Sequence, residues 1–274
     1  MKLAFTKMHG LGNDFMIVNG MTQSFDLSRE EIRKIADRHI GVGFDQLLLL
    51  EKKRNSDSDF HYRIFNADGN EVAQCGNGAR CLCQYIVDKK LSEKTEMILE
   101  TKNRKLIGKI LSDGFVSVSL GMPSFDPDSL PFVTAQQQKR YILDVKGEEI
   151  VFNIVSMGNP HAVIIVPDVE TAPVEAIGKF LQTHPAFPAG VNVGFMQILS
   201  PARIALRVYE RGAGETLACG SGSAAAAVIG CRYHQLARNV AVNLQGGELF
   251  VDWQEDETVW LTGETTTVFE GCLV

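Results

Sequence analysis

The sequence lacks long apolar runs, an excess of basic residues and the opening of a secreted protein. No segment approaches the roughly 18 consecutive apolar residues of a membrane span, and the longest candidates, Gln46–Leu50 and Ala162–Val166, have the length of single strands. The formal net charge of −6 supplies no overall positive field for nucleic acid or an anionic membrane. Met1–Gly10 has no apolar run of the kind that a secretory signal peptide needs.

Cysteine is too sparse for a disulfide framework, because the chain has six cysteines at irregular spacings among 274 residues. No Cys-x₂-Cys pair is present, so the usual sequence signatures of a zinc site and of a dithiol redox site are missing. We therefore expect a cytoplasmic protein with reduced thiols, without a metal and without a nucleic-acid or membrane partner.

What is present is an ordinary globular composition, with 45% hydrophobic and 22% charged residues. At about 150 residues per domain, the length suggests two domains. An internal repeat supports that number. Arg63–Gly78 lies over Arg207–Gly222 without a gap, which pairs Arg63 with Arg207, Glu71 with Glu215 and Cys75 with Cys219.

Two weaker matches precede this block in the same order along the chain. Val42–Leu48 lies over Val193–Leu199, and Gly12-Asn13 lies over Gly158-Asn159. Chance matching of glycine-rich turns is the alternative explanation. The shared order favours a duplication instead.

Each half is predicted to contain strands and two helices. Ser28 has Glu31 three residues further on, which is the spacing of a capping box. The stretch from Gly220 opens with small residues, which is typical of a helix buried closely against strands. The proline-containing stretch Pro123–Gln138 is predicted to be an interdomain linker. The predicted helices are Ser28–His39, Gly76–Lys89, Pro173–His184 and Gly220–Gln235, and the predicted strands include Phe15–Val18, Leu47–Leu50, Phe115–Leu120, Val163–Val166 and Val259–Leu261.

The repeat separates two cysteines from the other four, because only Cys75 and Cys219 have a cysteine at the matching position. Both precede Gly-x-Gly at a predicted helix start, where amide N–H groups and the helix dipole favour a thiolate and lower its pKa. The same amides can bind a carboxylate.

Several uses of this pair stay open on the residues alone. The two thiols could form a redox disulfide, one of them could be a nucleophile with a separate base, or both could be buried structural cysteines. An enzyme that inverts a carbon centre needs a base on each face, one deprotonated and one protonated. Only this last use requires the symmetry that the repeat provides.

Motifs along nearly the whole chain resemble those of diaminopimelate epimerases. Together they are specific, whereas any one alone would be a weak signal. The matching segments are Lys7–Phe15, Gly41–Gln46, Phe65–Gly69, Gln74–Arg80, Ser156–His161, Asn192–Phe195, Tyr209–Thr216 and Ala218–Gly222.

The resemblance implies a mixed α/β fold of two pseudo-symmetric homologous domains. Each would be a mixed or antiparallel sheet wrapped around a central helix, with the active site in the interdomain cleft. The N-terminal half would span residues 1–122 and be joined by the tail 264–274, and the C-terminal half would span 123–263. The implied protein is an isomerase and a homodimer, with a small-molecule substrate and no cofactor. It would invert LL-2,6-diaminopimelate to meso-diaminopimelate on the route to lysine and peptidoglycan precursors.

The resemblance also assigns site residues. Cys75 and Cys219 would be the thiolate–thiol pair, and His161 and Glu210 would complete the catalytic set, with Glu210 also taking an ammonium group of the substrate. Backbone N–H groups would hold the carboxylate at the reacting carbon, namely those of Gly76, Asn77, Gly220 and Ser221. The remaining predicted substrate contacts are Asn13, Gln46, Asn66, Asn159, Asn192 and Arg211.

Structural uses of single residues stay open beside these assignments. An asparagine close to glycine or aspartate in the sequence, such as Asn13 or Asn66, is often a turn residue. Arg63 and Arg207 match through the repeat but not through the family's site, so we interpret both as structural. Phe269 stands where many relatives have tyrosine, in a tail that the family associates with dimer contacts.

Three other classes of protein are alternatives. A proline racemase or hydroxyproline epimerase would use the same cysteine logic on a shorter substrate, and Arg211 with Asn159 and Asn192 argues against it. A non-catalytic carboxylate-binding protein would not need two thiols. A pyridoxal phosphate enzyme would need a lysine in a convincing site, and none stands out.

Overall fold

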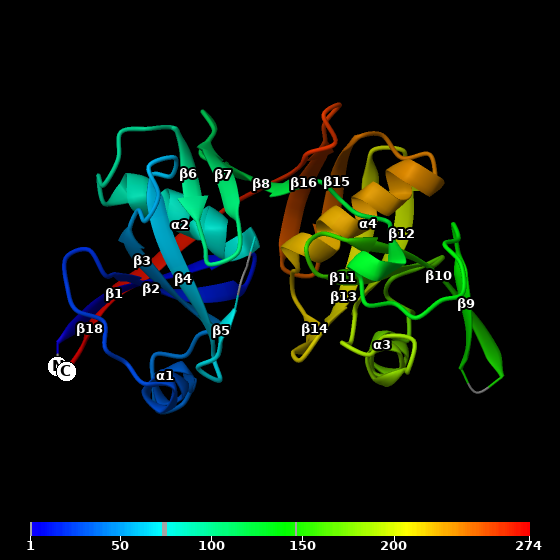
Figure 1. The fold of residues 1–274 in the computed structure, drawn as a ribbon, viewed down its shortest axis with the longest axis horizontal. Coiled ribbons are helices and arrows are strands. Elements are labelled where there is room, and N and C mark those ends of the chain that lie inside the picture. Colours follow the sequence, from blue (N-terminus) through cyan, green and yellow to red (C-terminus); the bar gives the residue numbers. More distant parts are fainter. Residues whose placement is uncertain (1, 73–75, 146) are drawn as a thin grey trace. The chain divides into compact units, whose positions relative to one another are not determined.

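The computed structural model describes residues 2–72, 76–145 and 147–274. The chain forms two compact units (Figure 1). Unit 1 comprises Met1–Ser119 and Thr262–Val274, and unit 2 comprises Leu120–Leu261. Within the described ranges, no helix combines the length and the hydrophobicity that crossing a bilayer needs.

Unit 1 contains two helices among its strands. The helices are α1 (Arg29–Ala36) and α2 (Gly76–Asp88). The strands are β1 (Leu3–Gly10), β2 (Asn13–Asn19), β3 (Gln46–Lys52), β4 (Phe60–Asn66), β5 (Glu71–Val72), β6 (Glu96–Glu100), β7 (Lys105–Ile110) and β18 (Thr266–Leu273). Two further strands, β8 (Val116–Gly121) and β17 (Val259–Gly263), carry the chain across the division between the units.

Unit 2 has the same plan. Its helices are α3 (Val174–Thr183) and α4 (Gly220–Tyr233), with a 3₁₀ turn η1 (Pro127–Ser129). Its strands are β9 (Tyr141–Val145), β10 (Glu148–Ser156), β11 (Pro160–Ile165), β12 (Asn192–Ser200), β13 (Arg203–Glu210), β14 (Gly214–Thr216), β15 (Asn239–Leu244) and β16 (Gly247–Trp253).

The strand pairings confirm that the chain is a duplication. In unit 1, β1–β2 is antiparallel, β2–β3 parallel, β3–β4 and β4–β5 antiparallel, β4–β6 parallel and β6–β7 antiparallel. In unit 2, β10–β11, β11–β12, β12–β13, β13–β14, β13–β15 and β15–β16 repeat this series of directions. Helices α1 and α3 each join the first parallel pair, and α2 and α4 join the second.

The ladders also show that one block of the predicted repeat is wrong. Gln46 begins β3 opposite Asn66, so Val42–Asp45 is the loop before that strand, whereas Val193 lies inside β12 opposite Tyr209. The match therefore placed a loop over a strand. The matched residues adopt different backbone conformations, because Gly43 has φ +72° and Gly194 lies in an extended strand.

A central helix lies against the strands of each unit, as the resemblance implied (Figure 1). Helix α2 contacts β1, β2, β3 and β7, and α4 contacts β10–β13, β15 and β16. The small side chains of Ala224–Ala227 are all buried, which fits a helix with strands on several sides. Gly78 in α2 lets the helix approach β2 and β3, because an added Cβ would lie 3.2 Å from Phe15 and 3.3 Å from Leu48.

The first helix begins as predicted and ends earlier. Ser28 caps α1, and Glu31 bonds back to the Ser28 backbone, so the predicted capping box is present. The helix ends at Ala36 rather than His39. Asp37 is extended, and its carboxylate accepts the N–H groups of His39 and Ile40 at 2.7 and 3.0 Å, which stops further helical bonding.

The prediction of a linker at Pro123–Gln138 is wrong. Leu130 and Phe132 are buried in the core of unit 2, where the Phe132 ring lies 4.7 Å from Tyr141 and 4.8 Å from Phe187 between centroids. The prolines prevent regular structure in this stretch, but the apolar residues between them still pack into a core.

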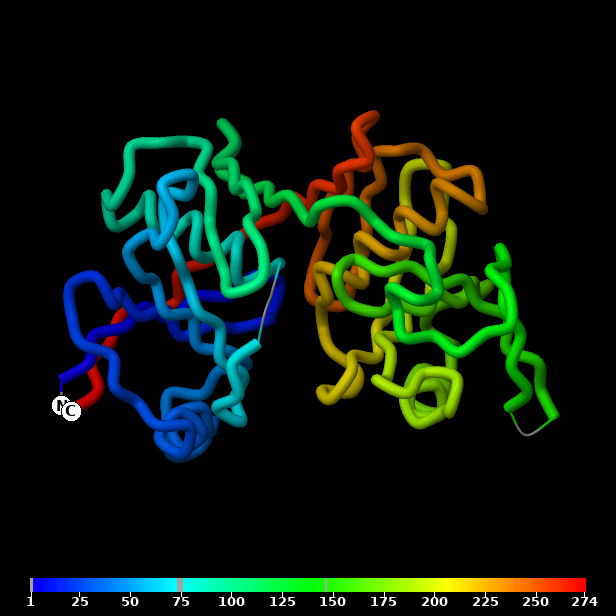
Figure 2. Tube along the Cα trace, viewed as in Figure 1, coloured from blue at the N-terminus to red at the C-terminus, as the bar shows by residue number. Residues whose placement is uncertain are grey.

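The two ends of the chain lie side by side in unit 1 (Figure 2). Strand β18 pairs antiparallel with β1, and Leu3 lies opposite Leu273. The tail thereby completes the sheet of the unit that the N-terminus begins.

Candidate active site

Cys219 lies where unit 2 turns from strand into helix. It is the N-cap of α4 and is 4% exposed, and its sulfur accepts the Gly222 N–H at 3.4 Å. The Ser221 hydroxyl is 3.6 Å from the same sulfur. Gly222 allows this arrangement, because a Cβ there would lie 3.3 Å from both Cβ and Sγ of Cys219.

The expected lowering of the Cys219 pKa is wrong. Burial raises the pKa of this thiol well above its usual value, and the nearby Glu210 carboxylate, which is hydrogen-bonded to it, raises it further. The Ser221 hydroxyl and the Gly222 N–H act in the opposite direction but are outweighed. Cys219 is therefore a neutral thiol at neutral pH.

Polar residues lie at the ends of two strands of unit 2. Glu210 ends β13, and its carboxylate accepts the hydroxyl of Thr216 on the facing strand β14. Asn192 begins β12 and accepts the Arg211 backbone N–H at 2.9 Å. The exposed Arg211 side chain donates to the Ala189 carbonyl at 3.0 Å.

His161 orients an asparagine in the same unit. Its Nε2 lies 3.0 Å from Asn159 Oδ1, and Asn159 Nδ2 donates to the Ser221 hydroxyl at 3.2 Å. Burial, together with a smaller effect of the Arg211 charge, lowers the pKa of His161 to about 3. The imidazole is therefore neutral and carries its proton on Nε2, since an amide oxygen only accepts.

The described site residues of unit 1 form two amide pairs. Gln46 Nε2 donates to Asn66 Oδ1 at 2.9 Å, across the β3–β4 ladder. Asn77, in the first turn of α2, donates from Nδ2 to Asn13 Oδ1 at 3.3 Å. Gly76 is the first residue of α2, and Cys75 lies outside the described residues.

A charged network next to these amides was missed by the sequence analysis. Asp14 accepts two bonds from Arg38 at 2.8 and 2.9 Å and one from Lys7, and Arg38 also donates to Asp45 at 2.8 Å. Burial opposes ionisation of Asp14, but the bonds from Arg38 and Lys7 outweigh it and lower the pKa of this carboxyl to about 2. A signal existed in the motif Lys7–Phe15, since charges within a buried strand need partners.

Matched ion pairs lie in the hairpins that precede α2 and α4. Arg63 holds Glu71 at 3.2 and 2.8 Å, and Arg207 holds Glu215 at 2.6 and 3.0 Å. Each pair joins the strand before a hairpin to the strand after it. Both arginines are thus structural, as interpreted from the repeat.

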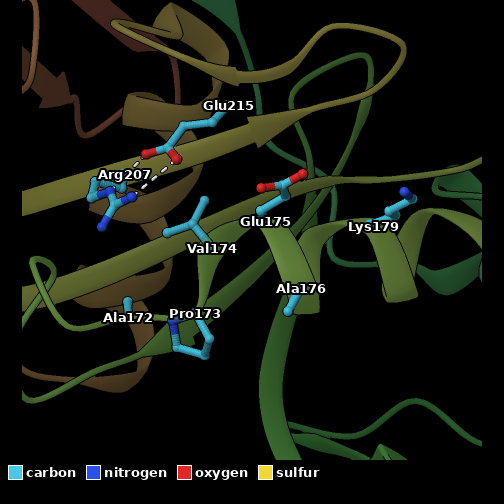
Figure 3. Close-up of a pocket in the computed structure, with 8 residues that line it drawn as sticks. All are labelled: Ala172, Pro173, Val174, Glu175, Ala176, Lys179, Arg207 and Glu215. Atoms are coloured by element: carbon cyan, nitrogen blue, oxygen red, sulfur yellow. Dashed lines mark hydrogen bonds and ion pairs between the residues drawn. The ribbon is translucent and has the colours of Figure 1, made fainter.

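A cavity of about 500 Å³ lies beside the first turns of α3 in unit 2 (Figure 3). The Arg207 and Glu215 side chains face each other at this cavity. None of the described site residues predicted from the sequence lines it, so it is distinct from the candidate active site. Its lining residues are Ala172, Pro173, Val174, Glu175, Ala176, Lys179, Arg207 and Glu215.

Solved structures of low sequence identity share this fold. A hydroxyproline epimerase from Agrobacterium vitis, determined with bound trans-4-hydroxy-L-proline, superposes with a TM-score of 0.73 at 15% identity, over 99% of this chain and 92% of that one. A PhzF-family phenazine biosynthesis protein from Bacillus anthracis superposes with a TM-score of 0.72 at 17% identity, over 100% and 99% of the two chains.

Sequence relatives are much closer. The diaminopimelate epimerase from Nitrosomonas europaea is 50% identical over 100% of this chain and 99% of its own length. The diaminopimelate epimerase from Nitrosospira multiformis is 49% identical over 99% of this chain and 98% of its own length. The family model described as diaminopimelate epimerase matches residues 5–125 and 153–268. With matches to both repeated halves and half of all positions identical to such relatives, the chain belongs to the diaminopimelate epimerase family.

Proposed function

We propose that this chain is an isomerase that inverts one α-carbon of LL-diaminopimelate to give meso-diaminopimelate, using two cysteines and no cofactor. The observation that carries the proposal is the identity of about half of all positions, over the full chain, with proteins named diaminopimelate epimerase. The product would feed lysine and peptidoglycan synthesis in the cytoplasm.

Cys219 supplies the acid of the reaction. Its raised pKa keeps the sulfur protonated at neutral pH, which is the state that a proton donor needs. Cys75, its match in the repeat, then starts as the thiolate. The Cys75 thiolate removes the α-proton from one face, so the C–H bond breaks and an S–H bond forms, and the electron pair moves toward the substrate carboxylate. The Cys219 thiol returns a proton to the opposite face and becomes a thiolate.

The helix starts supply the donors that stabilise the developing charge. The first bond along α4 runs from Ser223 N to Cys219 O, and Gly222 N is taken by the cysteine sulfur. Helix geometry therefore leaves the N–H groups of Gly220 and Ser221 for the carboxylate at the reacting carbon. Gly76 and Asn77 hold the matching positions in α2.

The polar residues at the strand ends bind the rest of the substrate. Diaminopimelate carries two amino-acid ends, so it needs both cation and carboxylate partners. Arg211 suits the distant carboxylate, and Glu210 suits an ammonium group. Amide groups complete the set, those of Asn13, Gln46, Asn66, Asn159 and Asn192. His161, being neutral, serves by holding Asn159.

We propose that the protein works as a homodimer through its tail. On β18, Val268 is 53% exposed and Phe269 is 45% exposed, which leaves apolar surface on the last strand. The Phe269 ring also packs edge-on against Phe5 at 5.9 Å between centroids. Sedimentation velocity of the wild-type protein and of Phe269→Glu tests the dimer, and a wild-type monomer at micromolar concentration refutes it.

The first test of the function is incubation with LL-diaminopimelate in D₂O, followed by NMR. We expect loss of the α-proton signal together with appearance of the meso product. Cys75→Ala and Cys219→Ala should each abolish epimerisation. Cys231→Ala removes a cysteine at the far end of α4 and should leave it unchanged. No α-proton exchange by the reduced wild-type protein overturns the proposal, and proline and hydroxyproline would then be tested as substrates.

A further inference from the structure

Arg80 is a buried cation that the proposed reaction does not use. It lies in α2 and is 0% exposed, the largest fully buried side chain among the described residues. A positive charge near a helix N-terminus opposes the helix dipole, and burying it carries a desolvation penalty. Its place is therefore not explained by helix stability.

A chain of hydrogen bonds leads from Arg80 to the predicted substrate-binding amides. Arg80 Nη1 donates to Asn77 Oδ1 at 3.0 Å, Asn77 Nδ2 donates to Asn13 Oδ1 at 3.3 Å, and Asn13 Nδ2 donates to Asp45 Oδ2 at 2.8 Å. We call these four residues the unit 1 relay. The relay connects α2, the start of β2 and the loop before β3.

The charges at the two ends of the relay fix the direction of every bond in it. A guanidinium only donates, so Asn77 turns its oxygen to Arg80 and its amino group to Asn13. A carboxylate only accepts, so Asn13 turns its amino group to Asp45 and its oxygen to Asn77. Both ends impose the same orientation, although an amide oxygen and amino group are nearly equal in size.

Asp45 is itself held in place. Arg38 bonds to both Asp45 and Asp14, and Asp45 also accepts the Asp14 backbone N–H at 3.2 Å. The anionic end of the relay is therefore anchored to β2 as well as to the loop.

The described residues of unit 2 form no such relay. The repeat places Ala224 opposite Arg80, and the corresponding asparagine, Asn159, is oriented by His161 instead. The buried arginine is thus specific to the half of the chain whose asparagine has no histidine in this role.

We propose that Arg80 is a positioning residue that fixes the amide orientation of Asn13 through Asn77 and thereby sets substrate affinity. The proposal rests on the proposed function, in which Asn13 contacts diaminopimelate. An Asn13 amide turned over would offer an acceptor where the substrate needs a donor, or a donor where it needs an acceptor.

Steady-state epimerisation of LL-diaminopimelate by Arg80→Met tests this role. Asn13 would bind substrate and transition state alike, so KM should rise about tenfold or more while kcat changes much less. Arg80→Lys should recover most of the affinity, because an ammonium group also only donates. Arg104→Met, which removes a half-buried arginine outside the relay in the same unit, should leave KM unchanged.

A second variant acts at the exposed end of the relay. Asp45→Asn replaces a pure acceptor by a group that can also donate, so KM should rise about threefold, less than in Arg80→Met. Asp57→Asn is the matched control, since Asp57 is an exposed carboxylate paired with Lys105 in the same unit. A lower apparent kcat at unchanged KM in both relay variants indicates mere loss of folded enzyme and overturns the proposal. An equal KM increase in Arg104→Met also overturns it.

A spectroscopic readout separates this proposal from the proposed function. If the wild-type protein does not epimerise diaminopimelate, the function fails while the relay can still be measured. The side-chain ¹⁵N–¹H signals of Asn13 and Asn77 should then shift in Arg80→Met and stay in place in Arg104→Met. Unchanged signals in Arg80→Met overturn the relay whatever the substrate is.

Discussion

Unit 1 and unit 2 share a backbone plan but carry different charges at equivalent positions. Near its asparagine pair, unit 1 has the buried Arg80 and the ionised Asp14, whose equivalents in unit 2 are Ala224 and Pro160. Unit 2 has instead Glu210 beside Cys219, where unit 1 has the neutral Asn66. The ladders and the Arg–Glu pairs of the hairpins are matched, whereas the residues around the site have diverged.

The proposed reaction would need such a divergence, because its two cysteines take opposite roles. A two-base inversion begins with one thiolate and one thiol, so two identical half-sites would be poorly suited to it. A carboxylate beside Cys219 favours the thiol, whereas unit 1 has the neutral Asn66 at the position equivalent to Glu210. In the proposed reaction, duplication would supply the two cysteines, and the unmatched Glu210 charge would distinguish Cys219 from its match.

The largest effect is expected at Glu210. Glu210→Gln removes the charge that helps to raise the Cys219 pKa, so alkylation of Cys219 should begin at lower pH. Because acid–base groups contribute roughly 10² to 10⁴ in rate, kcat should fall about 100-fold or more. Peptide-resolved mass spectrometry after iodoacetamide treatment across pH follows the thiol, and the NMR assay follows kcat.

Glu215→Gln is the control for this prediction, since Glu215 lies on the same hairpin and pairs with Arg207 rather than with Cys219. It should leave the alkylation profile of Cys219 in place. An unchanged pH dependence of Cys219 alkylation in Glu210→Gln would mean that burial alone keeps Cys219 protonated. The charge difference between the two units would then not explain the state of this thiol.

A second difference is His161, which is equivalent to Phe15 of unit 1 in the strand ladders. The folded pKa of about 3 lies below the unfolded value near 6.5, so the unfolded chain binds the proton first as pH falls. Stability should therefore decrease by about 1.4 kcal/mol per pH unit below 6.5 until about pH 3. His161→Phe installs the unit 1 residue and should remove this slope, about 2.5 kcal/mol at pH 4.5.

Urea unfolding of wild type and His161→Phe between pH 4 and 8 measures this difference. His39→Phe is the control, because His39 is exposed. Parallel stability curves for wild type and His161→Phe would show that the buried imidazole does not titrate as described. Epimerase activity should fall in His161→Phe, because Asn159 loses the group that orients it.

The features of this contrast that depend on neighbouring residues in the sequence could be predicted, whereas those that depend on residues far apart in the sequence could not. The cysteine match, the Arg63 and Arg207 match and the helix starts follow from short contiguous motifs, and the structure places these helices as predicted except at their ends. The motif Lys7–Phe15 indicates that its charges need partners, but the partners of Asp14 could not be identified, because Arg38 and Asp45 come from separate segments that only the fold brings together.

The pKa of Cys219 was mispredicted for a related reason. The helix start was visible in the sequence and does favour a thiolate through Gly222. The opposing effects are burial by the strands around α4 and the position of Glu210 at the end of β13, and both depend on long-range packing. The local motif shows only the helix start, which lowers the pKa. The larger effects of burial and of Glu210 raise the pKa of Cys219, and they come from residues distant in the sequence.

The third prediction concerns Asp14, whose charge has no equivalent in unit 2. Its folded pKa of about 2 lies below the model-peptide value of about 3.9, so it stabilises the fold above pH 4 and ceases to do so as pH falls toward 2. Asp14→Asn should lower the free energy of unfolding by about 2 kcal/mol at pH 7 and flatten the acid dependence between pH 4 and 2. Denaturant titrations at pH 7, 4 and 2.5 test this, with the exposed Asp26→Asn as control. Equal stability of Asp14→Asn and wild type at pH 7 would show that the Asp14 network does not stabilise unit 1.

The smallest expected effect separates the equivalent helices α1 and α3. Helix α1 has the Ser28–Glu31 capping box, whereas the N-cap of α3 is Pro173, which makes no side-chain capping bond. Ser28→Ala should therefore lower the free energy of unfolding by about 1 kcal/mol, while Pro173→Ala removes no capping bond and should change it by less than about half of that. Urea unfolding of both variants at pH 7 makes the comparison. Because α1 precedes the loop that holds Asp45, Ser28→Ala should also raise KM slightly, and Pro173→Ala should not. Equal losses of stability in the two variants would show that packing against the sheet, rather than the cap, determines where α1 begins.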